Sequence, residues 1–142
     1  MWFMHQTVEW TTPRDQWEEW NAEFHFTVDV ASTHENALCE KHYTIEEDGL
    51  TQDWSGEVVW ANPPYGPPLA KWVEKAHNEM KLGAVIVMLI PARTDTRWWQ
   101  KYISGDPSVE VKFLAGRLKF GNSKNSAPFP SALVIFRRLE AS

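Results

Sequence analysis

Residues 84–90, AVIVMLI, constrain the fold of this chain more than any other segment, because every position in the run is apolar. Gly83 precedes the run and Pro91 ends it. A short apolar run bounded in this way is typical of a strand that is buried on both faces of a sheet. Sheets covered on both faces are built mainly from parallel strands joined by helices. The run therefore predicts an α/β domain.

The segments around this run alternate between helix and strand patterns. Helices are expected over residues 12–23, 69–82 and 96–103, with a helical turn at 36–40, and strands over residues 26–30, 43–45, 58–61, 109–114 and 133–137. Thr12 is the expected N-cap of the first helix, with Pro13 at its first position, and Gly83 is the expected C-cap of the second. This order predicts a three-layer α/β sandwich with a mostly parallel sheet and an antiparallel C-terminal strand.

Composition excludes several classes of protein. The length of 142 residues suits one compact domain, residues 1–142. The net charge of -5 argues against a broad basic surface, so nucleic-acid binding would need a local patch. The single cysteine, Cys39, excludes an internal disulfide framework and a cysteine-rich zinc module, and the five histidines lack ligand spacing, so no metal is expected. Without a membrane-spanning run or a secretory signal, we expect no membrane partner and a cytoplasm-like compartment.

The motif with the clearest chemistry directly follows the expected strand 58–61. It reads Asn62, Pro63, Pro64 and Tyr65, and ligands of open α/β sheets bind outside the carboxyl ends of the strands. The two prolines fix the backbone and carry no N–H, so the Asn62 side-chain oxygen and the Pro63 carbonyl remain as acceptors without nearby donors. With an aromatic ring beside them, these acceptors suit a planar NH₂ group on a ring. The alternatives are a plain strand-ending turn and a proline-rich ligand for an adaptor.

The stretch WANPPYG resembles the (D/N/S)PPY motif of amino-group DNA methyltransferases, and other stretches resemble the phage-type DNA N-6-adenine methyltransferases, the Dam-like phage family. Those stretches, from about Thr12 to Phe136, are TPRDQW, FTVDVA, EEDGLTQDW, PARTDTRWW, GRLKFG and APFPSALVIF. The resemblance implies a minimal class-I-like fold and a phage-encoded enzyme of the host cytoplasm. It implies methyl transfer from S-adenosylmethionine to the N-6 amine of a flipped adenine in DNA, without a metal. Asn62 and Pro63 would accept the amine hydrogens, and Tyr65 would stack on the base.

The same resemblance implies a set of residues that contact the cofactor. They are Thr12, Pro13, Asp29, Ala31, Asp53, Trp54 and Asn62. The segment after Asp29 departs from the family pattern, because it reads Val-Ala-Ser-Thr without a Gly-x-Gly, and the small Ala31 and Ser32 would substitute. The acid for the ribose stays open among Glu46, Glu47 and Asp48, and Trp54 and Trp60 are expected to flank the pocket. As alternatives, Asp29 caps a strand end and Asp53 caps the turn at residues 55–56.

The DNA contacts would come from loops, because 142 residues leave no room for a separate target-recognition domain. The expected residues are Arg93, Thr94 and Arg97 in one loop, and Arg117, Lys119, Asn122 and Lys124 in another. This small surface predicts a short or relaxed target sequence, and a homodimer is possible. The alternative functions are N-4 methylation of cytosine, disfavoured because Ser usually precedes PPY in that branch, and a catalytically silent nucleic-acid or protein-binding module that keeps the fold.

Overall fold

The computed structural model describes residues 12–114 and 129–139 of the chain. The helices are α1 (Arg14–Phe24), α2 (Leu69–Lys81) and α3 (Arg97–Trp99), with a 3-10 helix η1 (Gly49–Thr51) and a π-helix η2 (Gln100–Ser104) that continues α3. The strands are β1 (Val28–Asp29), β2 (Val58–Ala61), β3 (Val85–Pro91), β4 (Val109–Phe113) and β5 (Ser131–Phe136). None of the helices within these ranges is long and apolar enough to span a bilayer.

The five strands form one mixed sheet in the order β1-β2-β3-β5-β4. Strands β1, β2 and β3 run parallel, and β5 lies antiparallel to both β3 and β4. The apolar run occupies β3, which pairs with β2 on one side and β5 on the other, and its residues from Ile86 to Ile90 are fully buried. The predictions of an α/β fold and of an antiparallel C-terminal strand are therefore confirmed. The sheet itself is mixed, with two parallel and two antiparallel strand pairs.

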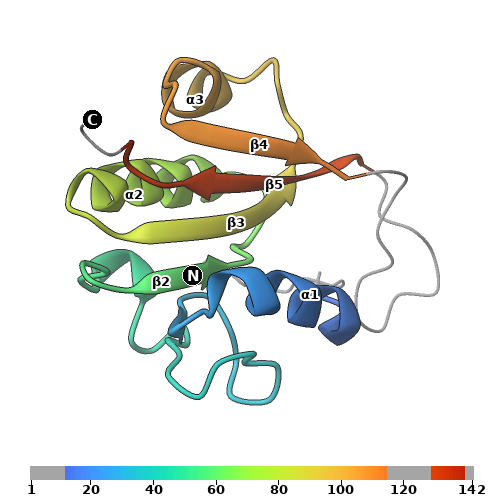
Figure 1. Ribbon diagram of the computed structural model, residues 1–142, viewed down its shortest axis with the longest axis vertical. Coiled ribbons are helices and arrows are strands. Elements are labelled where there is room, and N and C mark those ends of the chain that lie inside the picture. The colour runs from blue at the N-terminus through green and yellow to red at the C-terminus, as the bar shows by residue number, and fades with distance from the viewer. Residues whose placement is uncertain (1–11, 115–128, 140–142) are drawn as a thin grey trace.

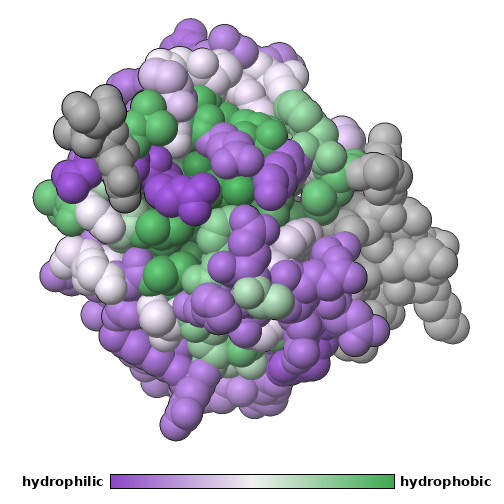
Figure 2. Space-filling model, in the orientation of Figure 1, coloured by the Kyte–Doolittle hydropathy of each residue, from purple (hydrophilic) through white to green (hydrophobic). Residues whose placement is uncertain are grey.

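Helices cover both faces of the sheet, as the alternation of side chains along β3 requires. Val87 and Leu89 belong to the core that packs under α1, whereas Ile86 and Met88 belong to the core that packs under α2 and η2. Figure 1 shows α1 in front of the sheet and α2 behind it. On the front face, apolar surface gathers over the strands, and hydrophilic residues dominate around α1 and the segment that follows it (Figure 2).

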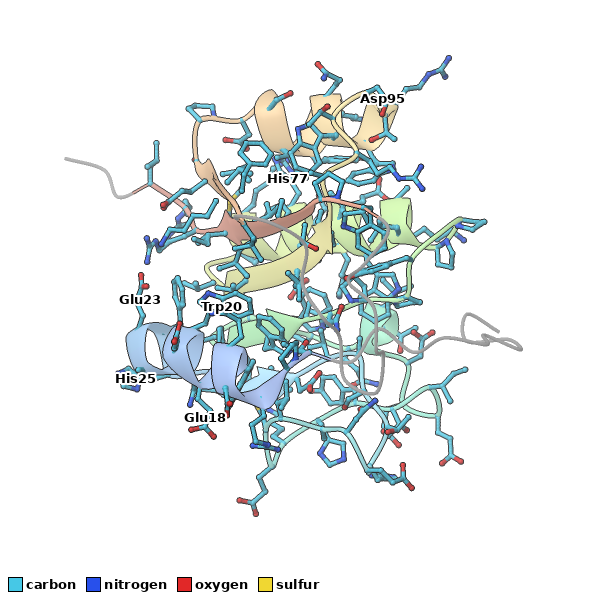
Figure 3. All side chains as sticks on the ribbon, turned by 90° about the vertical axis from the view of Figure 1, so that its right-hand side faces the viewer. Glu18, Trp20, Glu23, His25, His77 and Asp95 are labelled. Atoms are coloured by element: carbon cyan, nitrogen blue, oxygen red, sulfur yellow. The ribbon has the colours of Figure 1, made fainter. Side chains whose placement is uncertain are left out.

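Helix α1 is anchored to the sheet by aromatic side chains. Trp20 stacks on Trp60 of β2 with ring centroids 5.6 Å apart, and Trp17 is buried in the same core. Viewed along the sheet in Figure 3, Trp20 points from α1 toward the strands, and Glu18 points away. Trp60, the third residue of β2, therefore packs under α1.

Local side-chain bonds explain where the predicted elements differ from the structure. Helix α1 begins at Arg14 and its N-cap is Pro13, so Thr12 is not the cap. The prediction of a strand at residues 43–45 is wrong. A single parallel bridge joins Asp29 to His42, and the Thr44 backbone N–H then bonds the Glu47 carboxylate at 2.7 Å, which turns the chain away. The helical turn expected at 36–40 is also absent from the structure, which has turns and bends there.

A capping motif ends α2 and determines where β3 begins. Helix α2 ends in a Schellman motif, in which Ala84 N–H donates to the Glu79 carbonyl at 3.1 Å and Gly83 N–H donates to the Met80 carbonyl at 3.0 Å. Gly83 adopts φ +103°, a conformation that other residues rarely tolerate. The prediction of Gly83 as the capping glycine is confirmed, and the motif sets the start of β3.

Candidate active site

The carboxyl ends of β1, β2 and β3 lie along one edge of the sheet, because the three strands are parallel and adjacent. The residues that follow them are Val30, Asn62 and Ala92. In Figure 1 the arrowheads of β2 and β3 point to the right, and Figure 3 shows the molecule from that right-hand side. We call this side, built from the segments 30–32, 62–65 and 92–97, the carboxyl edge.

Asn62 joins the segment before α1 to the motif that follows β2. Its side-chain Nδ2 donates a hydrogen bond to the Thr12 hydroxyl oxygen at 3.0 Å. The Tyr65 hydroxyl has the Asn62 Oδ1 at 3.1 Å and the Leu89 carbonyl oxygen of β3 at 3.2 Å as acceptors. Thr12, Asn62 and Tyr65, three of the predicted site residues, are therefore brought together by direct hydrogen bonds.

Tyr65 is held between β3 and the start of β5. Its ring meets Phe129 edge-on, with centroids 5.5 Å apart and an interplanar angle of 81°. Burial raises the pKa of the Tyr65 phenol, so the hydroxyl stays a donor at neutral pH. Pro63 is buried and Pro64 is half-buried, which fixes the backbone between Asn62 and the aromatic ring.

The Asp29 carboxylate organises the loop that leaves β1. It accepts the Ala31 N–H at 3.2 Å and the Leu38 N–H at 3.1 Å, and the residue is only 2% exposed. Burial raises the pKa of Asp29 to about 6, against the opposing effect of the two N–H donors. The Asp29 carboxylate thus binds two backbone N–H groups of the loop that follows β1 and fixes the shape of this loop.

The 3-10 helix η1 packs directly against the end of β1. A Cβ at Gly49 would lie 2.2 Å from the Val30 carbonyl oxygen, so only glycine allows this approach. The contact brings Asp48 to the carboxyl edge, where its Oδ1 accepts the Leu50 N–H at 3.1 Å. Asp48 also adopts φ +56°, which is unusual for a non-glycine residue.

This position of Asp48 was not predictable from the sequence. Asp48-Gly49 reads as a turn, and nothing in the pattern indicates which strand the turn touches. Of the other two acids considered for the ribose, Glu47 is bound to both the N–H and the hydroxyl of Thr44, and Glu46 is exposed.

Asp53 and Trp54 lie along α2 rather than beside Asn62. Asp53 Oδ1 accepts the Ser55 N–H at 2.8 Å and its hydroxyl at 2.7 Å, and these bonds lower the pKa of the exposed Asp53. Trp54 is fully buried and stacks on Trp72 of α2. Its indole N–H donates to the Gly49 carbonyl at 2.9 Å. Asp53 therefore caps the turn at 55–56, and the Trp54 indole stabilises η1 through its hydrogen bond to Gly49.

The loop after β3 carries exposed cationic side chains at the same edge. Arg93, Thr94 and Arg97 are all exposed, and in the described part of the chain neither arginine takes part in an ion pair. Asp95, labelled in Figure 3, lies in the same loop. The remaining predicted DNA contacts lie outside the described residues: Arg117, Lys119, Asn122 and Lys124.

Two histidines that looked unpaired in the sequence contact each other. His34 Nδ1 and His42 Nε2 are 2.8 Å apart. Within residues 12–114 and 129–139, however, no group of three or more His, Cys, Asp or Glu side chains is arranged to hold a metal ion.

The fold and the site together define an α/β protein whose ligand edge is built around an Asn-Pro-Pro-Tyr turn. A family model described as DNA N-6-adenine-methyltransferase (Dam) matches residues 4–141. The chain belongs to this family.

Two curated relatives are similar to the chain over most of its length. A DNA N-6-adenine-methyltransferase of Escherichia phage T1 is 36% identical over an alignment of 145 residues. The match covers 84% of this chain and 60% of the relative. A DNA N-6-adenine-methyltransferase of Haemophilus phage HP1 (strain HP1c1) is 26% identical over 136 residues, which cover 89% of this chain and 77% of the relative. The match thus spans about 60% of the length of the relative from Escherichia phage T1.

Proposed function

We propose that the chain is an S-adenosylmethionine-dependent DNA methyltransferase that acts on the exocyclic N-6 amine of adenine. Its fold would be a minimal class-I-like methyltransferase domain. The observation that carries the proposal is the hydrogen-bonded cluster of Thr12, Asn62 and Tyr65 at the carboxyl edge, in a chain whose family and relatives bear that description.

The chemical problem is that the lone pair of an aromatic amine is delocalised into the ring. In our proposal the Asn62 Oδ1 and the Pro63 carbonyl accept the two amine hydrogens, which favours tetrahedral nitrogen and frees its lone pair. Bound S-adenosylmethionine supplies an electrophilic methyl group carried by a sulfonium. The chain contributes alignment and acceptors aimed at the positive charge that develops on nitrogen.

Tyr65 has to release Asn62 before the amine can use the same oxygen. The Tyr65 hydroxyl donates to Asn62 Oδ1, and the Leu89 carbonyl is its second available acceptor. We therefore expect the phenol to give up its bond to Asn62 and to donate to the Leu89 carbonyl instead when its ring stacks on the extruded base. Pro64 fixes the chain between Pro63 and the ring, which limits the motion to the Tyr65 side chain.

For the cofactor we propose the segments that meet at the ends of β1 and β2: Thr12-Pro13, Asp29 to Ser32, and Asn62. One feature of these segments fits a bound ligand: the Ser32 hydroxyl is buried without a hydrogen-bond partner among the described residues. For the ribose or adenine we add Asp48 to Asp53, because the packing of η1 against Val30 brings Asp48 to the carboxyl edge.

For DNA we propose that Arg93, Thr94 and Arg97 bind the backbone next to the flipped base, since they are exposed at the edge that carries Asn62. Arg117, Lys119, Asn122 and Lys124 would extend this contact. Residues 1–142 would form one methyltransferase domain.

The direct test is methyl transfer from tritiated S-adenosylmethionine into DNA. Asn62→Ala and Tyr65→Ala are each expected to lower the rate at least about a hundredfold, as loss of a group that stabilises developing charge does elsewhere. Lys81→Ala, an exposed change at the other end of α2, should keep wild-type activity. Wild-type rates in both Asn62→Ala and Tyr65→Ala would contradict the site. Failure to bind S-adenosylmethionine at millimolar concentration would favour the silent binding module.

A further inference from the structure

Strand β4 is the outermost strand of the sheet, and among the described residues no strand pairs with its outer edge (Figure 1). None of its five residues is buried, whereas all six residues of the neighbouring β5 are buried. Phe113, a large apolar side chain at the end of β4, is 65% exposed. A strand edge of this kind offers backbone N–H and C=O groups to a further strand.

The register with β5 determines which backbone groups of β4 point outward. The N–H of Leu114, directly after β4, donates to a carbonyl at the start of β5 at 3.1 Å, and the same register continues along both strands. In an antiparallel pair every second residue directs its N–H and C=O to the partner, and the residues between them direct theirs away. Glu110 and Lys112 therefore face β5, and Val111 and Phe113 direct their backbone groups to the outer edge.

The side chains of β4 alternate between an apolar face and a charged face. Val109 and Val111 pack against the core under α2 and η2, and Phe113 follows at the same spacing of two. Glu110 and Lys112 are exposed on the other face. In the parts of the chain that the structure describes, Lys112 forms no ion pair. The edge thus carries one acid and one unpaired base, two positions apart.

We propose that the outer edge of β4 pairs with the same edge of a second copy of this chain, antiparallel and centred on Val111. In this pairing Val111 exchanges two backbone hydrogen bonds with its equivalent, and the Phe113 N–H donates to the Val109 carbonyl of the other copy. Glu110 lies opposite Lys112, and Val109 lies opposite Phe113. Opposite charges and apolar side chains in such cross-strand positions stabilise an antiparallel pair.

Charge selects this register over its neighbours. A centre between two residues would place outward-facing backbone groups opposite inward-facing ones. A centre on Glu110 would place this residue opposite itself, and a centre on Lys112 would do the same for the lysine. Like charges directly opposite each other are destabilising. The Arg137 guanidinium is 3.9 Å from Glu110 and both side chains are 52% exposed, so this contact competes only weakly with a second copy.

The pairing leaves the proposed active site of each copy open. Strands β3 and β4 both run antiparallel to β5, so an antiparallel second copy directs its carboxyl edge the opposite way. An edge of five residues buries less surface than a standard interface, and the association is therefore reversible and weak. The inference goes beyond the proposed methylation and does not rest on it.

Sedimentation velocity over a concentration series tests the pairing. Wild type should shift from monomer to dimer between about 1 µM and about 500 µM. Glu110→Lys and Lys112→Glu should each stay monomeric over this range, because each change places two pairs of like charges across the interface. Lys81→Glu makes the same change of charge at an exposed position of α2. This matched control should dimerise as wild type does.

Mixing the two single variants tests the register. In an equimolar mixture the two basic residues of the Glu110→Lys chain lie opposite the two acidic residues of the Lys112→Glu chain, so a heterodimer should form at least as well as the wild-type dimer. A wild-type chain that stays monomeric throughout the series would overturn the inference. A dimer that survives both single changes, or a mixture that stays monomeric, would overturn it too.

Hydrogen exchange tests the backbone contact directly. The amide protons of Val111 and Phe113 should exchange more slowly at high than at low concentration of wild type, and equally fast at both concentrations in Lys112→Glu. Exchange in wild type that is independent of concentration would contradict pairing at this edge. None of these measurements needs S-adenosylmethionine or DNA, so they give the same answer for an active and an inactive chain.

Discussion

At the scale of single residues, Asn62 connects three parts of the chain that are distant in sequence: the segment before α1, the turn after β2 and, through Tyr65, strand β3. The sequence predicted which residues form the acceptor turn, because the two prolines fix the backbone locally and the aromatic residue directly follows them in the chain. It did not predict the partner of Thr12, which was expected to cap a helix, because that contact depends on how α1 docks on the sheet. Asp48 was left among three candidates for the same reason.

Asp29 gives a residue-scale prediction about pH. Its folded pKa of about 6 lies above the ordinary value of 3.8, so the protonated carboxyl is favoured in the folded chain. The resulting stability is complete below about pH 4 and is lost as the pH rises through about 6. Relative to Asp29→Asn, wild type should lose up to about 3 kcal/mol of unfolding free energy between pH 4 and pH 7.

Urea denaturation of both proteins at pH 4, 5, 6 and 7 measures this difference. The comparison removes the contribution of all other titrating groups, which are common to the two chains. A difference in unfolding free energy that is the same at pH 4 and pH 7 would show that the Asp29 pKa is not raised.

At the scale of helices and strands, β2, α2 and β3 were predictable to within one residue at each end, because the apolar pattern, the Asn-Pro-Pro turn and Gly83 mark their limits. The local structure of the region between β1 and β2 was not predictable in this way. There the side chains of Glu47 and Asp29 bind the backbone N–H groups of Thr44 and Leu38, and these bonds replace the strand and the helical turn that the sequence suggested.

Two glycine substitutions test whether η1 shapes the cofactor region. Gly49→Ala would press a Cβ against the Val30 carbonyl and move Asp48 from the carboxyl edge, so the Kd for S-adenosylmethionine should rise at least about tenfold. Gly83→Ala, whose Cβ meets nothing within 4 Å, should lower the unfolding free energy by about 1–2 kcal/mol through its positive φ alone.

Calorimetric titration and urea denaturation of the two variants separate the effects. Gly83→Ala is the matched control, since it lies at the far end of α2 and should bind the cofactor as wild type does. Unchanged cofactor affinity in a folded Gly49→Ala would remove η1 and Asp48 from the proposed cofactor site.

At the scale of the whole molecule, the distribution of charge on the described residues fits the proposed DNA contact at one edge of the sheet. The outer surface of α1 exposes Asp15, Glu18, Glu19 and Glu23, which repel phosphates, while the carboxyl edge exposes Arg93 and Arg97. The net charge of -5 is thus compatible with DNA contact at one edge. The sequence predicted the α/β class and the need for a local cationic patch, because both follow from patterns spread over many residues.

This arrangement predicts the salt dependence of DNA binding. If Arg93 and Arg97 each contact a phosphate, the double change Arg93→Ala, Arg97→Ala should reduce the slope of log K against log salt by about 2. Lys81→Ala, at the opposite edge of the sheet, should leave the slope unchanged. Fluorescence anisotropy with a labelled duplex over a salt series gives both values. A wild-type slope in the double variant would place the DNA elsewhere.

The central claim is that Asn62 directs a methyl group to the N-6 amine of adenine, and product analysis tests it most directly. DNA is incubated with the chain and S-adenosylmethionine, digested to nucleosides and analysed by mass spectrometry. Wild type should produce N-6-methyladenine, and Asn62→Ala, with its fold verified by thermal denaturation, should produce at least about a hundredfold less. N-4-methylcytosine as the product, or N-6-methyladenine at equal levels from both proteins, would contradict the account.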